Sequence, residues 1–383
     1  MSSLPASADV VVVGGGAIGT SVAFHLAEAG VGVCLIERDQ LASGSTSRAA
    51  GGFRAQFSDP LNIAIGLRSI EAFTRFGERP GAEIDLHQVG YLFLLDREDD
   101  VAVFESSVAL QNELGVPSRF VDLAEVQELC PLAGLDGVLA ATYCALDGHA
   151  SPEAVVQGYA AGARAHGASV LTHCAATNVL LDDHVIRGVE TSQGTIETGA
   201  VVCAAGVWSP EVARAAGVEL PVVPYLREVG FTGQAPGLPE RFPLTVDFSS
   251  GLYFHREGPG LLFGMADPEQ PAGLDVPADP VWLERVLEVA ERRLPSLLDM
   301  GIAGGWKGHY EVTPDHNALV GESQAASRFL YATGFSGHGF LQGPAVGEIV
   351  RDLVLRNEPF VDVAPLSVDR FAHSLPRPEH NVI

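Results

Sequence analysis

The stretch Val10-Val11-Val12-Val13-Gly14-Gly15-Gly16-Ala17-Ile18-Gly19 decides the fold of this 383-residue chain. Its continuous apolar run is typical of a parallel strand that is buried on both faces of a sheet. Gly14 permits a tight turn, Gly16 lets the backbone approach a pyrophosphate, and Gly19 lets the next helix pack closely on the strand. The stretch therefore predicts a strand–turn–helix unit that binds a dinucleotide.

The residues that follow complete this unit. A helix predicted over residues 17–29 begins with Ala17 and Ile18, so its positive end faces the phosphates. The next apolar run ends in Glu37, whose carboxylate can accept hydrogen bonds from ribose hydroxyls. We include the adjacent Arg38 among the candidate cofactor contacts. Because Glu37 disfavours a 2′-phosphate, the motif indicates FAD or NAD rather than NADP.

Composition and charge narrow the class of protein. The formal charge of −25 argues against nucleic acid or an anionic membrane as a partner. The five cysteines are scattered without a CxxC pair, so we expect reduced thiols. No histidine pair has metal-ligand spacing beside a carboxylate, so we expect no metal. The polar start lacks the pattern of a signal peptide and no apolar run reaches membrane-spanning length, so we expect a cytoplasmic protein.

Three later segments combine glycine or small residues in ways that suit cofactor binding. The loop over residues 43–52 offers hydroxyls, backbone amides and a cation. The strand predicted over residues 201–206 ends in small residues, and a glycine-rich loop over residues 334–340 precedes a helix predicted over residues 343–355. The candidate cofactor contacts from these segments and from a strand predicted over residues 169–179 are Ser45, Thr46, Ser47, Arg48, Gly52, Val179, Ala205, Gly206, Gly337, His338, Gly339, Phe340 and Leu341.

The order of these segments predicts an α/β protein with a discontinuous Rossmann-type FAD-binding domain and an inserted antiparallel-sheet substrate domain. Residues 221–308 are rich in Pro and Gly with short alternating runs, which is typical of antiparallel strands. We assign residues 1–85, 146–220 and 315–383 to the FAD-binding domain, and residues 86–145 and 221–314 to the substrate domain. A cofactor met by residues from both ends of the chain favours the elongated FAD over a nicotinamide nucleotide.

Five motifs, in a consistent order along the chain, resemble the FAD-dependent oxidoreductases of the D-amino-acid oxidase superfamily. The resemblance is greatest to the branch of sarcosine oxidase, glycine oxidase and the β subunits of proline dehydrogenase complexes. It implies FAD and oxidation of a C–N bond by hydride transfer to flavin N5. The motifs are VVVGGGAIG (11–19), GSTSRAAGGFRAQF (44–57), VVCAAGVWS (201–209), WKGHYEVTPDHNALVG (306–321) and TGFSGHGFLQGPAVGE (333–348).

The resemblance also suggests site residues. Arg54, after a glycine pair, matches an arginine that binds the substrate carboxylate, and such a guanidinium would offset the acidic field of the protein. Tyr310 and Tyr253 match active-site tyrosines, each of which can offer an apolar wall and a hydroxyl. His338 lies in the predicted flavin loop and can contact the flavin or hold that loop.

The chain also departs from the family pattern. The cysteine that attaches FAD covalently in monomeric sarcosine oxidases is replaced by Gly308, so we expect non-covalent FAD. Two family lysines, one for oxygen activation and one for the carboxylate, fall at Leu262 and Leu341. Lys307 is a possible replacement cation. These changes leave oxygen and another electron acceptor equally open.

The predicted function is oxidation of a small amino acid or secondary amine of the sarcosine, glycine or proline type. One alternative is a biosynthetic flavoenzyme of the same fold that acts on a larger amine or a cyclic imine, for which Leu262 and Leu341 would suit a more apolar pocket. A different class, a non-catalytic FAD-binding subunit or assembly factor, rests only on the missing lysines. The expected partners are the substrate and an electron acceptor, and the oligomeric state is open.

Overall fold

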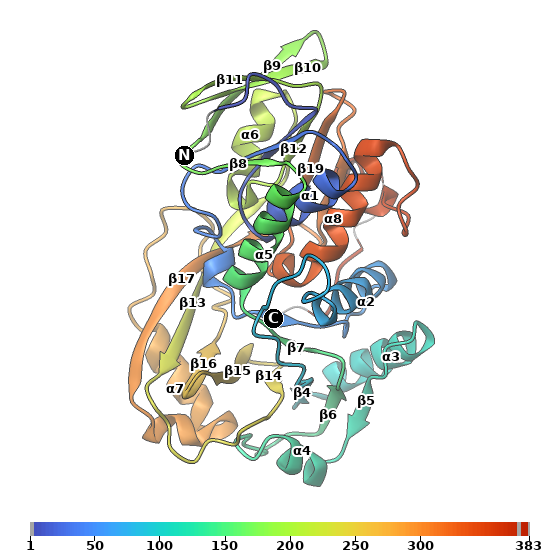
Figure 1. Cartoon of the computed structure of the whole chain (residues 1–383). Helices are drawn as coiled ribbons and strands as arrows, with labels where there is room; N and C mark the ends of the chain where they lie inside the picture. Colours follow the sequence, from blue (N-terminus) through green and yellow to red (C-terminus); the bar gives the residue numbers. More distant parts are fainter. Residues whose placement is uncertain (1–3, 374–376, 382–383) are drawn as a thin grey trace.

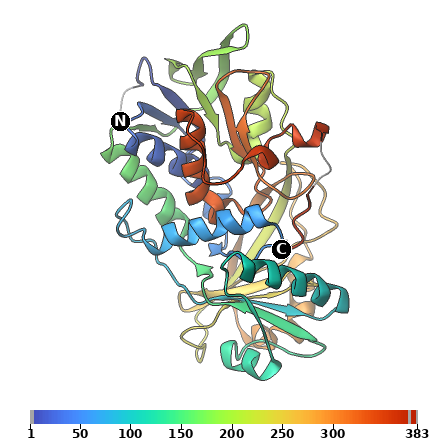
Figure 2. The ribbon, with the colours of Figure 1, turned by 90° about the vertical axis from the view of Figure 1, so that its right-hand side faces the viewer.

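The computed structural model describes residues 4–373 and 377–381, which form two large sheets with helices around them (Figures 1 and 2). The first sheet has the strand order β18-β19-β12-β1-β2-β8 and is parallel except for the β18–β19 pair. Its strands are β1 (Val10–Val13), β2 (Val33–Ile36), β8 (Ser169–Leu171), β12 (Val201–Cys203), β18 (Leu319–Glu322) and β19 (Phe329–Thr333).

Apolar side chains alternate between the two faces of this sheet, as expected for a sheet that is covered on both sides. Val10 and Val12 pack into a core with the helices on one face, whereas Val11 and Val13 pack toward the other face. The first face is covered by α1 (Ala17–Glu28), α5 (Pro152–Ala165) and α8 (Gly339–Leu355), with α2 (Pro60–Thr74) against α8. The second face is covered by α6 (Ser209–Ala215) and a small sheet of β9 (Ala176–Asp182), β10 (Val185–Thr191) and β11 (Gly194–Glu197).

The second large sheet has the order β17-β13-β16-β15-β14-β4-β6-β5. It combines β4 (Tyr91–Leu95), β5 (Arg119–Val121) and β6 (Ala140–Cys144) with β13 (Val223–Thr232), β14 (Leu244–Asp247), β15 (Leu252–Glu257), β16 (Gly260–Gly264) and β17 (Ile302–Val312). One face packs on α4 (Leu123–Leu129) and α7 (Trp282–Arg293). The alternate residues, such as Tyr91 and Tyr253, point away from that core. α3 (Glu98–Glu113) flanks β4, and β3 (Gly52–Phe53) pairs with β7 (Gly148–His149) between the large sheets.

The predicted fold class is confirmed, with three differences in detail. The strand expected over residues 169–179 is two strands in different sheets, because the chain turns at His173, whose φ is +55°. The helix expected from residue 343 begins at Gly339, inside the predicted glycine loop. The inserted sheet is not wholly antiparallel, because β4 and β14 run parallel.

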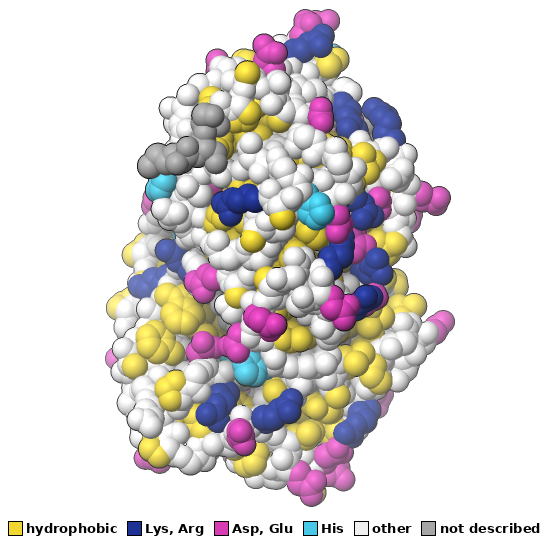
Figure 3. All heavy atoms as spheres, in the orientation of Figure 1, with side chains coloured by type: hydrophobic (Ala, Val, Ile, Leu, Met, Phe, Trp, Pro, Cys, Tyr) yellow, Lys and Arg dark blue, Asp and Glu magenta, His cyan; other side chains and the backbone are white. Residues whose placement is uncertain are grey.

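The strands of the first sheet fall within residues 1–85, 146–220 and 315–383, and those of the second within 86–145 and 221–314. The division into two domains stays a prediction. In the view of Figure 3, acidic side chains are spread among arginines and lysines and do not gather in one patch. Within the described residues, no helix is both long and apolar enough to cross a membrane. The short α9 (Arg370–His373) precedes a segment, residues 377–381, that returns to the centre of the molecule.

Candidate active site

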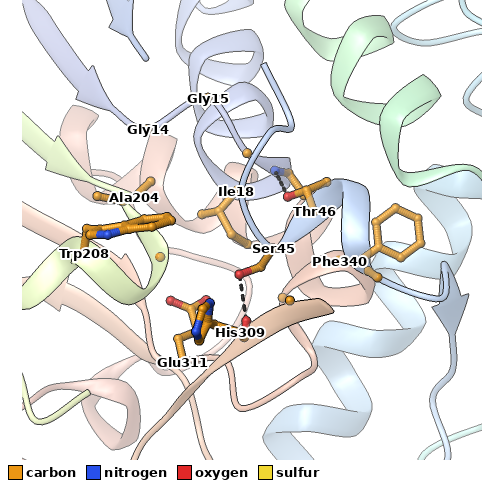
Figure 4. A pocket seen from close by; sticks show the side chains of 18 of the residues that line it. Gly14, Gly15, Ile18, Ser45, Thr46, Ala204, Trp208, His309, Glu311 and Phe340 are labelled. Carbon is orange, nitrogen blue, oxygen red and sulfur yellow. Dashed lines mark hydrogen bonds between the residues drawn. The ribbon is translucent and has the colours of Figure 1, made fainter. Parts of the chain in front are cut away.

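A cavity of about 590 Å³ extends from the glycine turn after β1 to the second large sheet. Figure 4 shows part of its wall, with Gly14 and Gly15 near one end and His309 and Glu311 of β17 across from them. Segments far apart in sequence contribute to this wall: the ends of β1, β2 and β12, the loop over residues 43–52, and residues of β13, β15 and β17. The cavity thus lies between the two sheets that the sequence predicts as separate units.

The glycine turn brings backbone unusually close to backbone. Gly14 has a φ of +115°, and a Cβ there would lie 2.2 Å from the carbonyl oxygen of Ala204. A Cβ on Gly19 would lie 1.9 Å from the carbonyl oxygen of Gly14, so helix and turn pack as the motif requires. Neither position can hold a side chain without a shift of the backbone. The turn therefore presents main-chain amides and the first turn of α1 to the cavity.

Glu37 lies at the rim of the cavity where β2 ends. Its two carboxylate oxygens accept hydrogen bonds from the backbone amides of Gly15 (2.7 Å) and Asp39 (2.8 Å). Arg38 stacks over the ring of Trp208, with the guanidinium carbon 4.1 Å from the ring centroid. These contacts fix a carboxylate beside the glycine turn, as recognition of a ribose requires.

The hydroxyl-rich loop joins the two halves of the wall. Thr46 Oγ1 accepts a hydrogen bond from the Ala17 amide (3.2 Å), and Ser45 donates to the carbonyl oxygen of His309 on β17 (2.7 Å; Figure 4). Arg48 packs over Gly308, where a Cβ would lie 2.8 Å from the Cβ of Arg48. The glycine at 308 therefore leaves the space that Arg48 uses.

Most of the predicted cofactor contacts line this one cavity. Gly19 and Ser47 do not: Gly19 acts in packing, and the Ser47 amide donates to the Ala42 carbonyl. The residues that do line it are Gly14, Gly16, Ala17, Ile18, Glu37, Arg38, Ser45, Thr46, Arg48, Gly52, Val179, Ala205, Gly206, Gly337, His338, Gly339, Phe340 and Leu341.

The loop before α8 reaches the cavity at its second-sheet end. Gly337 has a φ of +96°, and a Cβ there would lie 2.5 Å from the ring of Tyr310. His338 precedes the first helical residue, Gly339, so the N-terminal end of this 17-residue helix lies at the cavity. A helix dipole so placed can stabilise negative charge on a bound ligand.

Arg54 is buried, with 2% of its surface exposed, and also lines the cavity. Its guanidinium donates to the carbonyl oxygens of Gln56 and Asn381, and Nη2 lies 3.3 Å from Nε2 of His338. Burial lowers the pKa of Arg54 from its usual value, which the negative charges of Glu379 and Asp147 partly oppose. No carboxylate of the described residues lies within 4.0 Å of the guanidinium. A buried arginine without an acidic partner is suited to a carboxylate that arrives with a ligand.

Asp147 supports the segment that carries Arg54. Its oxygens accept hydrogen bonds from the Ala55 amide and the Gln56 side chain, both at 2.9 Å. Burial raises the pKa of Asp147 to about 7, because the charged form is poorly solvated there. The residue therefore shapes the loop without supplying a full negative charge to Arg54 at neutral pH.

Three tyrosines form the wall beside Arg54. Tyr253 and Tyr310 are predicted site residues, and Tyr91 of β4 joins them in lining the cavity. Burial raises the pKa of each hydroxyl, so all three are neutral at physiological pH. They can donate or accept hydrogen bonds and carry no charge that would compete for the arginine.

His338 is neutral as well. Burial, and then the positive charge of Arg54, lower its pKa well below the usual value. Its ring meets Phe57 edge-on, with 5.0 Å between the ring centroids. An uncharged imidazole at this point can orient Arg54 or accept a hydrogen bond, but it is a poor source of protons at neutral pH.

Several lining residues were not predicted: Tyr91, Arg227, Trp208 and Glu311. Arg227 lies on β13 outside the quoted motifs, and only knowledge of the strand register would have brought it to the cavity, whereas Glu311 of β17 follows Tyr310 within a quoted motif. Trp208 was within a quoted motif and could have been chosen from it.

Lys307, by contrast, is half-exposed, lies 3.8 Å from Glu228, and is not among the lining residues. Leu341 lines the cavity, whereas Leu262 is buried away from it.

The cavity fits a flavin dinucleotide. A turn that excludes a Cβ, a fixed carboxylate at its rim and two helix N-terminal ends are the features that hold a pyrophosphate, a ribose and a flavin. Fold and site together define a dinucleotide-dependent oxidoreductase with a two-part cavity.

Comparison with known proteins places the chain within that class. Residues 9–353 match the family model described as FAD dependent oxidoreductase (DAO), and the chain belongs to this family, with FAD as its cofactor. Dimethylglycine dehydrogenase of Mus musculus is 30% identical over 95% of this chain and 44% of its own length. The chain thus spans less than half the length of that relative.

Two solved structures share the fold closely. L-proline dehydrogenase from P. horikoshii has a TM-score of 0.92 and 31% identity, covering 98% of this chain and 100% of its own. Glycine oxidase from Geobacillus kaustophilus has a TM-score of 0.86 and 26% identity, covering 96% of this chain and 99% of its own. The predicted branch of the family is confirmed.

Proposed function

We propose that this oxidoreductase oxidises the C–N bond of a small amino acid or secondary amine, of the sarcosine, glycine or proline type. The observation that carries the proposal is the buried Arg54, which has no carboxylate within 4.0 Å in the described part of the chain, beside neutral tyrosines in a cavity that suits FAD. Dimethylglycine, proline and glycine, the compounds named for the related proteins, each pair an amine with a carboxylate.

In this proposal, Arg54 binds the substrate carboxylate and sets the distance of the adjacent C–N bond from the cofactor. Two parallel hydrogen bonds from a guanidinium fix both position and angle. Tyr253 and Tyr310 exclude water and present hydroxyls to the polar end of the substrate. When bound, FAD supplies the two-electron acceptor for the hydride that leaves the substrate carbon, and water then hydrolyses the iminium product.

The neutral surroundings also favour an uncharged amine. An ammonium group would be poorly solvated between tyrosines of raised pKa and the cationic Arg54, so the deprotonated amine is the form that fits. A neutral amine has the lone pair that assists departure of hydride. This requires no side chain to remove a proton from carbon.

We propose that FAD is held without a covalent bond. Cys174 is the cysteine that lines the cavity among the described residues, and its amide donates to the Glu37 carbonyl at the ribose end, far along the wall from Tyr310. Precipitation with acid should release all of the flavin into the supernatant. Flavin retained in the protein pellet would contradict this proposal.

The function is tested with the purified holoprotein under exclusion of oxygen. Sarcosine, dimethylglycine, glycine, both enantiomers of proline and several larger amines are added, and the absorbance of oxidised flavin is followed. Rapid bleaching by one small amino acid supports the proposal, while bleaching only by larger amines favours the biosynthetic alternative. Bleaching by none of them would favour a non-catalytic FAD protein. Admission of air afterwards measures how well oxygen serves as the electron acceptor.

A further inference from the structure

The second-sheet end of the cavity holds a second cation, Arg227 of β13. It lies opposite Gly308 in the β13–β17 pairing, on the same face as Val229, which also lines the cavity. The guanidinium carbon lies 5.1 Å from the ring centroid of Tyr310 and 5.7 Å from that of Tyr225. Arg227 therefore faces the same tyrosine wall as Arg54.

The hydrogen-bonding capacity of Arg227 is largely unused. Its Nη1 donates only to the carbonyl oxygen of the preceding Leu226 (3.0 Å), and its buried Nε has no partner among the described residues. No described carboxylate lies within 4.0 Å of it. The neighbouring Glu228 is engaged elsewhere, with Lys307 at 3.8 Å and with the Asp279 amide at 3.0 Å. A half-buried guanidinium with an unpaired Nε and no nearby carboxylate costs free energy, which an anionic group on a ligand would offset.

The group that would pair with Arg227 has to come from the main cavity. Behind the guanidinium, Met265 and Ala266 help to enclose a second space of only about 10 Å³. That volume holds at most one water molecule and no carboxylate. Arg54, Arg227 and Tyr310 all line the main cavity, and the positive charge of each arginine lowers the pKa of the Tyr310 hydroxyl, which burial raises more strongly.

We propose that the substrate carries two anionic groups, one bound by Arg54 and a second bound by Arg227. The ligand class is an amino acid with a second carboxylate on its side chain or on its nitrogen substituent. This inference rests on the proposed function for the role of Arg54, and it makes Arg227 the residue that determines specificity. A monoacid would leave the Arg227 guanidinium without an anion, which is the energetic basis of the preference.

The test measures binding of unreactive analogues in which sulfur replaces the amine nitrogen, by calorimetry on the holoprotein. (Methylthio)acetate is compared with thiodiacetate, whose second acid lies on the nitrogen-substituent side. 2-(Methylthio)propanoate is compared with (methylthio)succinate, whose second acid lies on the side chain. At least one diacid should bind about 10-fold or more tightly than its monoacid, because it satisfies a second buried cation.

Two variants of Arg227 and one control complete the design. Arg227→Gln should bring the diacid-to-monoacid ratio close to one while changing monoacid affinity by less than about threefold. Arg227→Lys keeps the positive charge but loses the two parallel hydrogen bonds of a guanidinium, so it should give an intermediate ratio. This variant also tests the inference if Arg227→Gln folds poorly. Lys307→Gln removes a cation from the adjacent strand outside the cavity and should leave the ratio unchanged.

Ratios near one in the unaltered protein, or an equal loss of monoacid and diacid binding in Arg227→Gln, would overturn the inference. A failure of the proposed function can be distinguished from a failure of this inference. If monoacid amines bleach the flavin but diacids show no preference, only the diacid inference is wrong. If diacids bind selectively but no amine of either kind bleaches the flavin, the ligand class stands and the oxidation does not.

Discussion

The two ends of the cavity are built by different means. At the nucleotide end, recognition depends mainly on the backbone: the glycine turn, the N-terminus of α1 and one carboxylate held by amides, mostly within residues 10–52. At the substrate end, side chains carry it: Arg54 comes from the loop after β3, and the tyrosines come from strands of the second large sheet that are far apart in sequence. Recognition through the backbone tolerates few substitutions in the protein but selects only weakly between ligands. The side chains at the other end decide which substrate fits.

The most severe test of this contrast is Gly14→Ala. The new Cβ would lie 2.2 Å from the Ala204 carbonyl oxygen at a φ of +115°, so the turn cannot persist unchanged. We expect complete loss of bound FAD, measured as the flavin-to-protein absorbance ratio after gel filtration. Gly199→Ala is the control, because nothing lies within 4 Å of its added Cβ. A yellow Gly14→Ala protein would show that the backbone turn is dispensable.

Glu37→Arg tests the one side chain on which the nucleotide end depends. It replaces the carboxylate that accepts from the Gly15 and Asp39 amides with a cation. We expect FAD affinity to fall at least about 100-fold, from the loss of charge-assisted hydrogen bonds. Titration of the apoprotein with FAD provides the measurement, with Glu197→Arg as the control because Glu197 is exposed at the end of β11. Unchanged affinity would remove Glu37 from the ribose site.

Arg54→Ala tests the substrate end. We expect kcat/KM to fall by a factor that corresponds to about 2–4 kcal/mol, if the guanidinium pairs a desolvated carboxylate. FAD content should stay normal, because that end of the cavity is built elsewhere. Arg54→Lys should recover part of the loss since it keeps the charge. Near-normal kinetics in Arg54→Ala would exclude Arg54 from substrate binding.

An effect on stability rather than on activity is expected from two buried imidazoles, one on β7, which pairs with β3, and one on β15. The rings of His149 and His255 lie 4.3 Å apart, and burial lowers their pKa values to about 2 and about 4. Both are neutral in the folded protein but become protonated in the unfolded chain below pH 6.5. The contribution of these two histidines to the free energy of unfolding should therefore fall as the pH drops below 6.5, by about 1.4 kcal/mol per pH unit for each group until its folded pKa is reached, while Asp147, whose pKa is raised, opposes part of this slope.

Urea unfolding at pH 7, 6 and 5 measures this slope, and His149→Gln should make it shallower by one group. The free energy above pH 7 should respond to the substitution only through packing. A slope between pH 7 and pH 5 that His149→Gln leaves unchanged would contradict the prediction.

The smallest effect is expected for Lys307→Ala. The side chain is half-exposed, lies near Glu228 and does not line the cavity. Substrate kinetics and flavin reoxidation by oxygen should change by less than about twofold, as for a surface charge. A large change in reoxidation alone would show that the field of this lysine reaches the flavin.

The same contrast explains what could be predicted from the sequence. The nucleotide end was predictable because its requirements are local: a positive φ at Gly14 and an acid after the second strand. Arg227 was not, because its place on the wall depends on its pairing with Gly308 of β17, which a single sequence does not reveal. The start of α8 was placed four residues late because glycines in Gly337–Gly343 indicate a loop, although burial against α1 and α2 makes that segment partly helical. Arg54, Tyr253 and Tyr310 were found through family resemblance rather than through local pattern.

The parallel pair β4–β14 has a consequence for how this protein reaches its native state. It joins Tyr91–Leu94 to Leu244–Asp247 at the centre of the eight-stranded sheet. During synthesis, β4 has a partner only in β6 until residue 247 has emerged, and its other edge is open to other chains. Assembly of the sheet is therefore slowed by long-range pairing, and nascent chains that stall between these two strands are the species most prone to aggregate.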